Sequence, residues 1–263
     1  MITPGVAATA ISVAGVAMRY AARGASVAAL ADMSFDVAER EFVAIVGPSG
    51  CGKSTLLKIL AGLLPPTRGE ARLRGTPIAG PRRDIGVVFQ APVLFPWRTV
   101  LDNVLLPVDV QGLPRDRHRR AALDLLALVG LEGFEQRYPW ELSGGMQQRV
   151  SIIRALIHDP AMLLMDEPFG ALDAMTRELM NLELQRIWLE RQKTVLFITH
   201  SIPEAVFLAD RVLVMTPRPG AIMDDVAVRL PRPRSLDAMS TSEFGGCVAR
   251  IRARFNAQGG VDA

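Results

Sequence analysis

The chain has 263 residues, of which 49% are hydrophobic and 22% charged, and its formal net charge is +3. This composition suits a globular protein with a sizeable core, as one large domain or two lobes, and no run approaches the roughly 20 apolar residues that span a bilayer. The apolar start of the chain lacks the basic residues of a signal peptide and two cysteines do not indicate a disulfide framework, so we expect a cytosolic protein.

The N-terminal part predicts antiparallel strands, because residues 11–37 alternate apolar and polar side chains around a loop at Gly24. Tyr20 is an aromatic residue in this stretch. Its ring fits two roles, stacking on an adenine base or half-buried packing in a strand, and the local spacing does not choose between them.

A phosphate-binding loop follows. Residues 42–46 predict a buried strand, and residues 47–55 match G-x-x-x-x-G-K-[ST] before a helix-favouring segment. Glycines let successive N–H groups point at phosphate oxygens, and the helix start adds its unpaired N–H groups. The candidate phosphate-binding residues are Gly47, Pro48, Ser49, Gly50, Cys51, Gly52, Lys53, Ser54 and Thr55. A glycine-rich turn with a solvated lysine is the alternative, and for Cys51 we favour a small filler residue over a redox role.

The next segment contains a polar strand end and an apolar loop. Residues 70–73 and 85–89 predict strands, and Gln90 ends the second one. Its amide fits a role at Mg²⁺ or at the attacking water, or that of an ordinary loop amide. Residues 91–100 are apolar and interrupted by prolines, so they form no regular element and are either buried or held for a partner.

Two helices are predicted after this loop. One covers residues 114–131, and the second runs from a Ser-Gly-Gly turn at Ser143, Gly144 and Gly145 to about His158. The second helix offers another N-terminus that can bind an anion. The arginine-rich runs at 115–120 and 229–254 suit nucleic acid or a membrane surface, but we favour solvated faces.

Acidic and basic side chains end the later strands. Residues 161–166 predict a buried strand that ends in Asp166 and Glu167, where one carboxylate fits Mg²⁺ binding and the other fits activation of a water. A turn at residues 170–173 precedes a long helix to about Gln192. Residues 194–199 predict a strand that ends at His200, which fits a γ-phosphate contact or a helix cap. A strand at 211–215, an edge hairpin and a basic helix complete the chain.

The order of these motifs resembles that of the nucleotide-binding subunits of ATP-binding cassette (ABC) transporters. The Leu-Ser-Gly-Gly-Met sequence at 142–146 corresponds to the signature that separates this family from other phosphate-loop ATPases, and the resemblance extends from about Ser12 to Met223. Within the family, residues 95–100, 165–173 and 198–205 are similar to cassettes of nitrate, sulfonate and taurine importers.

The resemblance implies an α/β fold, with a phosphate-loop NTPase core on a mixed sheet, an antiparallel β subdomain and a helical subdomain that carries the ABC signature. We expect a single ABC ATPase domain over residues 11–256, with the helical subdomain at about 91–160 and flexible termini at 1–10 and 257–263. The family usually has glycine where this chain has Arg40, so Arg40 must avoid a positive φ or bear strain.

The resemblance also implies ATP and Mg²⁺ as cofactors and a role for each motif residue. Tyr20 would stack on adenine, and the phosphate loop would hold the phosphates. Glu167 would be the general base, and His200 would bind the γ-phosphate. The implied Mg²⁺ ligands are Ser54, Gln90 and Asp166.

The implied assembly is a head-to-tail homodimer with two ATP molecules at its interface. Ser143, Gly144 and Gly145 of one subunit would face the ATP held by the other, and Asp173 would bridge the subunits. We expect an ATPase at the cytoplasmic face of the membrane that powers uptake of a small anion through a separate permease, supplied by an external solute-binding protein. We hypothesise that Trp97 helps to receive a cytoplasmic helix of the permease, with ordinary packing as the alternative.

Two other functions remain open at this point. An ABC ATPase that acts on nucleic acid or ribosomes would suit the basic tail, although we expect no nucleic-acid partner because the chain has one cassette, no coiled-coil insertion and no zinc spacing. A nucleotide-gated clamp without useful turnover is disfavoured by the carboxylate of Glu167.

Overall fold

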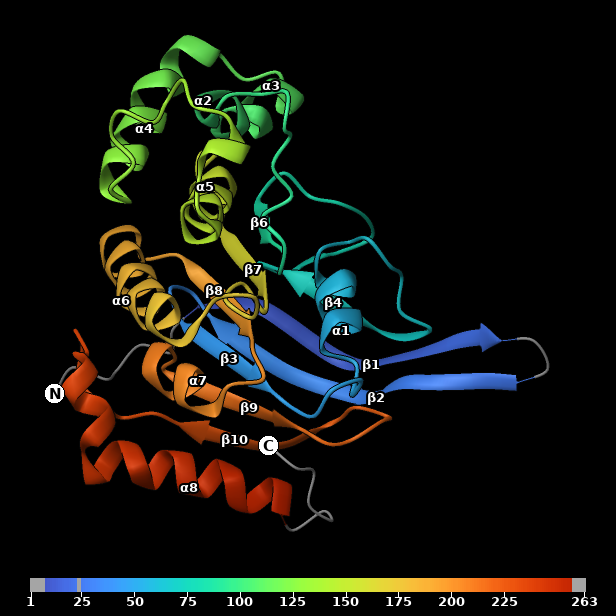
Figure 1. Cartoon of the computed structure of the whole chain (residues 1–263). Coiled ribbons are helices and arrows are strands. Elements are labelled where there is room, and N and C mark those ends of the chain that lie inside the picture. The colour runs from blue at the N-terminus through green and yellow to red at the C-terminus, as the bar shows by residue number, and fades with distance from the viewer. Residues whose placement is uncertain (1–7, 23–24, 257–263) are drawn as a thin grey trace, which may run out of the picture.

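The computed structural model describes residues 8–22 and 25–256 (Figure 1). Residues 1–7 and 257–263 of the expected flexible termini lie outside the described residues, whereas the first strand already begins at Thr9. Two sheets form the lower body in Figure 1, and a group of helices stands above them. No helix in the described part of the chain is long and apolar enough to cross a membrane.

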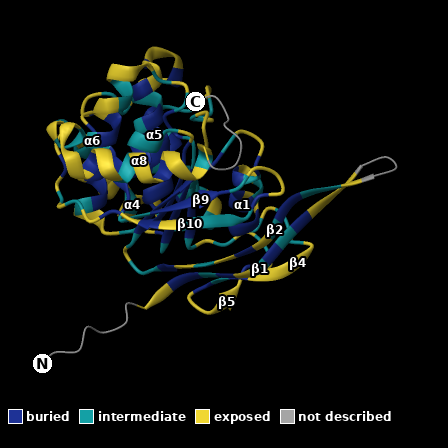
Figure 2. Ribbon diagram, turned by 90° about the horizontal axis from the view of Figure 1, so that it is seen from below, coloured by how far each residue is buried: buried dark blue, intermediate teal, exposed yellow. Residues whose placement is uncertain are grey.

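The expected antiparallel strands form a four-stranded sheet in the order β2-β1-β4-β5. These strands are β1 (Thr9–Ala22), β2 (Ala25–Ala38), β4 (Arg68–Leu73) and β5 (Thr76–Pro77). Alternate residues such as Ile11 and Val13 are buried, as one covered face requires. β1 and β2 extend beyond the body as a long hairpin (Figure 2), in which Tyr20 lies opposite Val27.

A six-stranded mixed sheet occupies the centre, in the order β10-β9-β3-β8-β7-β6. Its strands are β3 (Phe42–Val46), β6 (Ile85–Val88), β7 (Met162–Asp166), β8 (Thr194–Ile198), β9 (Arg211–Met215) and β10 (Ile222–Ala227). All neighbouring strands are parallel except β9 and β10, which are antiparallel. The carboxyl ends of β3, β7 and β8 therefore meet at one edge, where ligands bind in open α/β sheets.

Helices cover the central sheet and build the upper part of the molecule. The upper helices are α2 (Val100–Val104), α3 (Leu106–Gln111), α4 (Arg115–Leu128) and α5 (Gly144–Leu156), preceded by the short helix Pro139–Glu141. The others are α1 (Lys53–Leu60), α6 (Ala174–Arg191), α7 (Ile202–Leu208), the short helix Leu236–Ser240 and α8 (Ser242–Asn256). The arrangement is the predicted one: a mixed-sheet core, an antiparallel β part and a helical part that carries the Ser-Gly-Gly turn.

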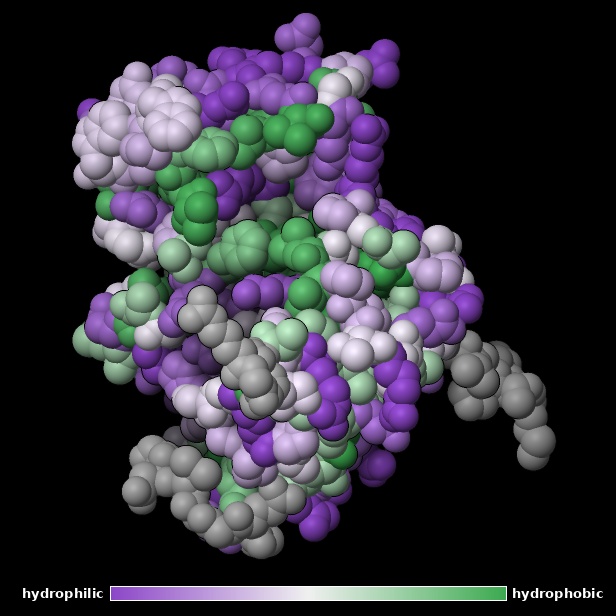
Figure 3. Space-filling model, turned by 90° about the vertical axis from the view of Figure 1, so that its right-hand side faces the viewer, coloured by the Kyte–Doolittle hydropathy of each residue, from purple (hydrophilic) through white to green (hydrophobic). Residues whose placement is uncertain are grey.

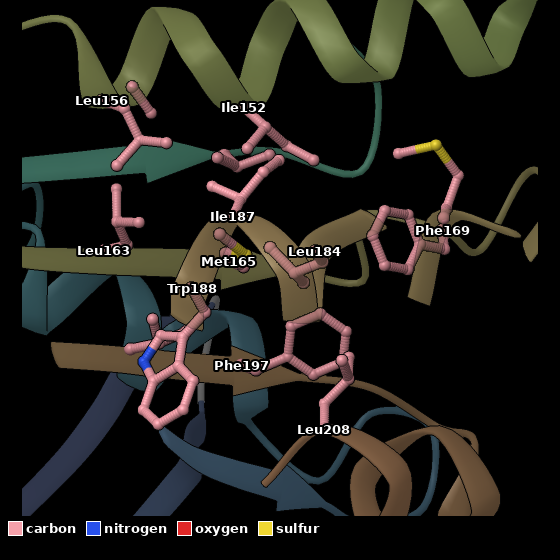
Figure 4. Packing of buried hydrophobic residues seen from close by; sticks show 14 of the residues in the cluster. Ile152, Leu156, Leu163, Met165, Phe169, Leu184, Ile187, Trp188, Phe197 and Leu208 are labelled. Atoms are coloured by element: carbon pink, nitrogen blue, oxygen red, sulfur yellow. The ribbon is translucent and has the colours of Figure 1, made fainter. Parts of the chain in front are cut away.

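The helical part is fixed to the sheet by hydrophobic packing. Figure 4 shows Ile152 and Leu156 of α5 above Leu163 of β7, with Leu184 and Trp188 of α6 beside them. All five side chains are at most 8% exposed. Because each fully buried side chain of this size contributes roughly 1.5–3 kcal/mol, this cluster holds α5 firmly against the end of the central sheet.

Two arginines fasten the segment after β10 to the body. Arg234 is 3% exposed and donates to the carbonyls of Val206, Phe207 and Ala209, which are orphan acceptors at the end of α7. Burial lowers the pKa of Arg234 to about 10. Arg232 pairs with Asp210 at 2.9 Å and stacks 4.3 Å over the ring of Trp188. We favoured a solvated face for the basic tail, but Arg232 and Arg234 of that tail are docked against the body.

The basic helix α8 is held against the edge strand β10. Asp224 of β10 accepts from Arg254 at 2.7 Å and lies 3.6 Å from Arg250. Phe244 and Ile251 of α8 are buried beneath it. The helix therefore packs through an apolar face and is also held by ion pairs of its second half with Asp224, which we call the Asp224 clamp.

Arg40 adopts the left-handed conformation, with φ of 64°. Its N–H donates to Thr194 Oγ1 at 2.9 Å, and the carboxylate of the following Glu41 accepts from the Ala38 N–H at 2.8 Å. Of the two outcomes left open by the sequence, the turn takes the strained one.

Candidate nucleotide site

The predicted phosphate loop joins β3 to α1 at the carboxyl edge of the central sheet. Gly50 and Gly52 have φ of 74° and 110°, which favour glycine. A Cβ on Gly52 would lie 2.7 Å from Leu30 Cδ2 and 2.8 Å from the Ala29 carbonyl. Glycine is therefore needed at this position for two reasons, the backbone conformation and the close approach of β2.

A cavity of about 270 Å³ opens in front of this loop. It is lined by Tyr20, Ala29, Ser49, Gly50, Gly52, Lys53, Ser54, Thr55, Glu167 and Arg218. Eight of these, all except Ala29 and Arg218, are among the predicted site residues. Tyr20 reaches over from the antiparallel sheet, and its hydroxyl lies 3.2 Å from Thr55 Oγ1. The cavity is thus bounded by an aromatic ring on one side and by the phosphate-binding loop on another.

The ammonium of Lys53 is buried behind the loop, since its side chain is only 6% exposed. Its Nζ donates to the carbonyls of Gly47 at 2.8 Å and Pro48 at 3.1 Å, and it lies 4.0 Å from Glu167 Oε1. The ammonium is therefore held in place by carbonyls of the phosphate loop itself, and the carboxylate of Glu167 is close enough to interact with it electrostatically.

Ser54 and Asp166 bring two oxygen donors together. The Ser54 hydroxyl donates to Asp166 Oδ1 at 3.3 Å, and burial raises the pKa of the Asp166 carboxyl. A partly buried carboxylate that is costly to ionise gains from a neighbouring cation. Hydroxyl and carboxylate oxygens are the ligands that Mg²⁺ prefers, so these residues fit that ion.

Glu167 and His200 follow neighbouring parallel strands, β7 and β8. Glu167 has a left-handed backbone with φ of 45°, and its N–H donates to the Ile198 carbonyl at 2.8 Å. His200 Nδ1 lies 3.2 Å from Glu167 Oε2. Backbone strain of this kind costs roughly 1–3 kcal/mol and concentrates at functional sites. The turn after β7 therefore aims the carboxylate toward both Lys53 and His200.

Gln90 and Asp173 lie outside the lining of the cavity. Gln90 is exposed, and its amide nitrogen would be 3.2 Å from a Cβ on Gly170. Asp173 caps α6, where it accepts from the N–H and hydroxyl of Thr176, and these bonds lower the pKa of the Asp173 carboxyl. The predicted role of Gln90 involves a metal ion, and that of Asp173 involves a second subunit.

The Ser-Gly-Gly turn also stands apart from the cavity. Ser143 caps α5 by accepting from the Met146 N–H at 3.3 Å, and Gly144 and Gly145 form the first turn. Gly145 approaches the start of α6, since a Cβ there would lie 3.1 Å from Thr176 Cγ2. Within the described residues, this helix start and the phosphate loop do not line one common cavity.

α5 also forms hydrogen bonds to the apolar loop after β6, residues 91–100. The sequence analysis did not predict this contact. Arg154 donates to the consecutive carbonyls of Pro92 and Val93, both at 2.8 Å, and Gln148 donates to the Phe89 carbonyl at 3.3 Å. Spacing gives no hint of these bonds because they join residues about 60 positions apart. One helix thus connects the Ser-Gly-Gly turn to the segment around Gln90.

The same loop presents aromatic side chains at the surface. Trp97 is 71% exposed and stacks on Phe95 with ring centroids 5.0 Å apart, and Val93 is exposed as well. Figure 3 shows hydrophobic residues gathered in a hollow between the upper helical part and the lower body. The loop was predicted to be either buried or held for a partner, and its exposure favours the second alternative.

Known proteins resemble the chain along most of its length. A family model described as ABC transporter matches residues 30–170. The chain is 51% identical over 221 residues to an uncharacterized ABC transporter ATP-binding protein of Methanocaldococcus jannaschii, covering 84% of this chain and 83% of that protein. It is 54% identical over 205 residues to the taurine import ATP-binding protein TauB of Rhizobium johnstonii, covering 78% of each.

Solved structures give the same relationship. The chain superposes with a TM-score of 0.73 and 34% identity on a dimeric structure of the ATP-binding cassette MJ0796 in a post-hydrolysis state bound to ADP and Pi. That match covers 84% of this chain and 100% of the other. A second dimeric structure of that cassette gives a TM-score of 0.74 and 35% identity.

Proposed function

Because the chain belongs to the family of ABC transporter ATP-binding proteins, we propose that it hydrolyses ATP to power uptake of a small solute through a separate permease. The observation that carries this proposal is the cavity in which Lys53, Ser54 and Thr55 face Glu167, while a second anion-ready helix start lies outside it. A single chain then supplies both halves of a nucleotide site, but to two different ATP molecules.

The proposed site assigns each part of the nucleotide to a part of the cavity. The phosphates lie on the N–H groups of residues 47–55, with the Lys53 ammonium released from its carbonyl partners toward them. The adenine stacks on Tyr20, whose ring bounds the same cavity.

Hydrolysis requires positioning and charge stabilisation more than covalent chemistry. Glu167 accepts a proton from the attacking water, and the contact between its Oε2 and His200 Nδ1 fixes the carboxylate. His200 then senses the γ-phosphate. Ser54, Asp166 and Gln90 would hold Mg²⁺, which when bound neutralises charge on the β- and γ-phosphates.

The proposed assembly is a head-to-tail dimer. Ser143, Gly144 and Gly145 of each subunit close the site of the other, and Asp173 lies at the junction. The dimeric structure of a cassette at 34% identity supports a dimer of some kind, and the head-to-tail arrangement is our proposal. Relatives named as taurine import ATP-binding proteins support the proposal that the protein belongs to an importer. We therefore place it at the cytoplasmic face of a membrane, with a permease and an external solute-binding protein as partners. The proposed solute is a taurine-like, sulfonate or nitrate anion.

The first test uses Glu167→Gln, which removes the proposed base but keeps its size. With ATP and Mg²⁺ the variant is expected to lose at least roughly 100-fold of its hydrolysis rate, as loss of a general base typically costs. It should also elute as a dimer in size-exclusion chromatography with light scattering, and as a monomer with ADP.

The matched control is Ser143→Arg in the same background, which places bulk and positive charge at the helix start. This double variant should stay monomeric with ATP. A dimer that persists would contradict the head-to-tail arrangement. Capture of tagged Glu167→Gln protein from detergent-solubilised native membranes should then recover a permease, whereas recovery of nucleic acid or ribosomes without one would overturn the importer assignment.

A further inference from the structure

The cavity contains one cationic residue that the motif analysis did not identify. Arg218 lies on the turn between β9 and β10 and lines the same cavity as Tyr20 and Lys53. It stands 165 positions after Lys53, outside every nucleotide motif of the chain. Its position therefore has to be explained from the fold.

The turn that carries Arg218 is fixed against the phosphate loop. Gly220 donates from its N–H to the Ala29 carbonyl at 3.0 Å and accepts from the Ala31 N–H at 2.8 Å, which forms an isolated parallel bridge to Leu30 of β2. A Cβ on Gly220 would lie 2.1 Å from the Cys51 carbonyl. Within the turn, the Thr216 hydroxyl donates to the Pro219 carbonyl at 3.1 Å and accepts from the Ala221 N–H at 3.0 Å.

The side chain of Arg218 is anchored near the ring of Tyr20. Its Nε donates to the Ala28 carbonyl at 3.2 Å. In the β1–β2 hairpin, Ala28 lies opposite Arg19, one position along from the pair of Tyr20 and Val27. Since adjacent strands lie about 4.8 Å apart, this anchor holds the guanidinium beside the aromatic boundary of the cavity, whereas Lys53 is held by Gly47 and Pro48 of the loop.

We propose that Arg218 binds the nucleoside half of the nucleotide. Its planar guanidinium stacks on the adenine ring, on which Tyr20 stacks as well. This inference rests on the proposed nucleotide site. A guanidinium stacks on aromatic faces more readily than an ammonium does because it is planar and weakly hydrated. The bond from Nε to Ala28 leaves the plane of the group fixed before ATP arrives, which limits the entropy lost on binding.

The chain offers a matched control in Arg19. It lies on the same rung of the hairpin as Ala28, but it donates from Nη1 to Ser26 Oγ at 3.1 Å and does not line the cavity. Its removal changes the net charge of the protein by the same amount as removal of Arg218. The two variants therefore separate a local contact from a general electrostatic effect.

The experiment is calorimetric titration of the purified chain with ADP and, separately, with inorganic pyrophosphate. Arg218→Ala is expected to weaken ADP binding roughly 3- to 30-fold, the equivalent of one cation–π contact, while pyrophosphate binding stays within about 2-fold. Arg218→Lys should recover little of the ADP affinity, and Arg19→Ala should bind both ligands like the parent chain. Unchanged pyrophosphate binding also shows that the phosphate loop has kept its fold.

The results separate the two proposals. If the parent chain binds ADP and Arg218→Ala binds it equally well, the inference fails and the nucleotide site stands. If pyrophosphate weakens as much as ADP, or if lysine restores full affinity, Arg218 contacts phosphate and the nucleoside assignment is overturned. A parent chain that binds neither ligand would overturn the nucleotide site itself.

Discussion

Arg40 illustrates how much of this molecule is decided by single backbone positions. With φ of 64° it occupies a conformation that costs a residue with a Cβ roughly 1–2 kcal/mol, and the turn keeps it because Thr194 accepts its N–H and Glu41 ties the turn to Ala38. Glu167 bears similar strain at the candidate site, where its φ is 45° directly after the end of β7. The first position concerns stability and the second concerns chemistry.

Arg40→Gly should therefore stabilise the protein by roughly 0.5–1 kcal/mol, after the greater flexibility of glycine in the unfolded chain is subtracted. Urea denaturation of the two proteins under identical buffer conditions measures the difference. Arg40→Ala keeps the Cβ and should show no comparable gain. A glycine variant no more stable than the alanine variant would mean that the turn bears no strain.

At the same scale, the motif residues could be placed from the sequence, while their partners could not. A phosphate loop carries its function in adjacent residues, so Gly52, Lys53 and Ser54 are visible as one pattern. Arg218 and Arg154 act through contacts with residues that are distant in the chain, and only the folded sheet brings them to the cavity and the loop. A lone arginine in a turn gives no periodic or spacing pattern that could reveal this.

Among the elements, α8 shows how a helix of moderate apolarity is kept on the surface of a domain. Its buried residues Phe244 and Ile251 give it a contact face, and Asp224 of β10 binds two arginines of its second half. The sequence predicted the helix and its basic character but assigned it no contact. An edge strand with an acidic residue and a basic helix are complementary only once both are placed side by side by the topology.

The Asp224 clamp should make the docking of α8 sensitive to acid. Burial acts to raise the pKa of Asp224, but hydrogen bonds and the charges of Arg254 and Arg250 outweigh it and hold that pKa below its usual range. A carboxyl whose folded-state pKa is lowered stabilises the fold above its unfolded pKa, and the contribution is lost as pH falls through the folded value.

Asp224→Asn should consequently speed amide hydrogen exchange in α8 at neutral pH, with a cost of at most about 1 kcal/mol, as for other surface ion pairs. The difference between parent and variant should shrink as the pH falls below about 4. Arg252→Gln, on the same helix but outside the ion pairs of Asp224, should exchange like the parent. A difference that persists unchanged in acid would show that the effect is not ionic.

For the whole molecule, the division into a sheet body and a helical part was predicted from the resemblance to ABC transporter subunits, whereas residue patterns predicted the individual strands and helices. The helical part is attached by a cluster of buried side chains and by the bonds of α5 to the loop after β6. The surface that contacts the proposed permease was less predictable, since the apolar sequence of the loop after β6 is equally compatible with burial in the core. The stacked aromatic pair of half-buried Phe95 and exposed Trp97 became evident only in the structure.

If this pair receives the permease, Trp97→Ala should lower solute uptake while ATP hydrolysis by the isolated chain stays within about 2-fold. The ring is 71% exposed, so its loss removes little core packing and unfolding is not expected. Uptake by cells that carry the variant, measured alongside hydrolysis by the purified protein, gives both readouts. Leu179→Ala removes a comparably exposed side chain, 63%, from α6 and should leave uptake intact. Normal uptake by the Trp97 variant would rule the contact out.

The hydrogen bonds from α5 to the carbonyls of Pro92 and Val93 have a thermodynamic consequence. Any two ligands that bias the position of one shared rigid helix are linked, and each changes the affinity of the other by the same factor. A partner bound at the loop would thus change the affinity of the Ser143 helix start for the ATP of a neighbouring subunit. Binding of that ATP would change the affinity of the loop for the partner by the same factor. Reciprocity of this kind means that the state of the permease could be measured at the nucleotide, without observing the solute.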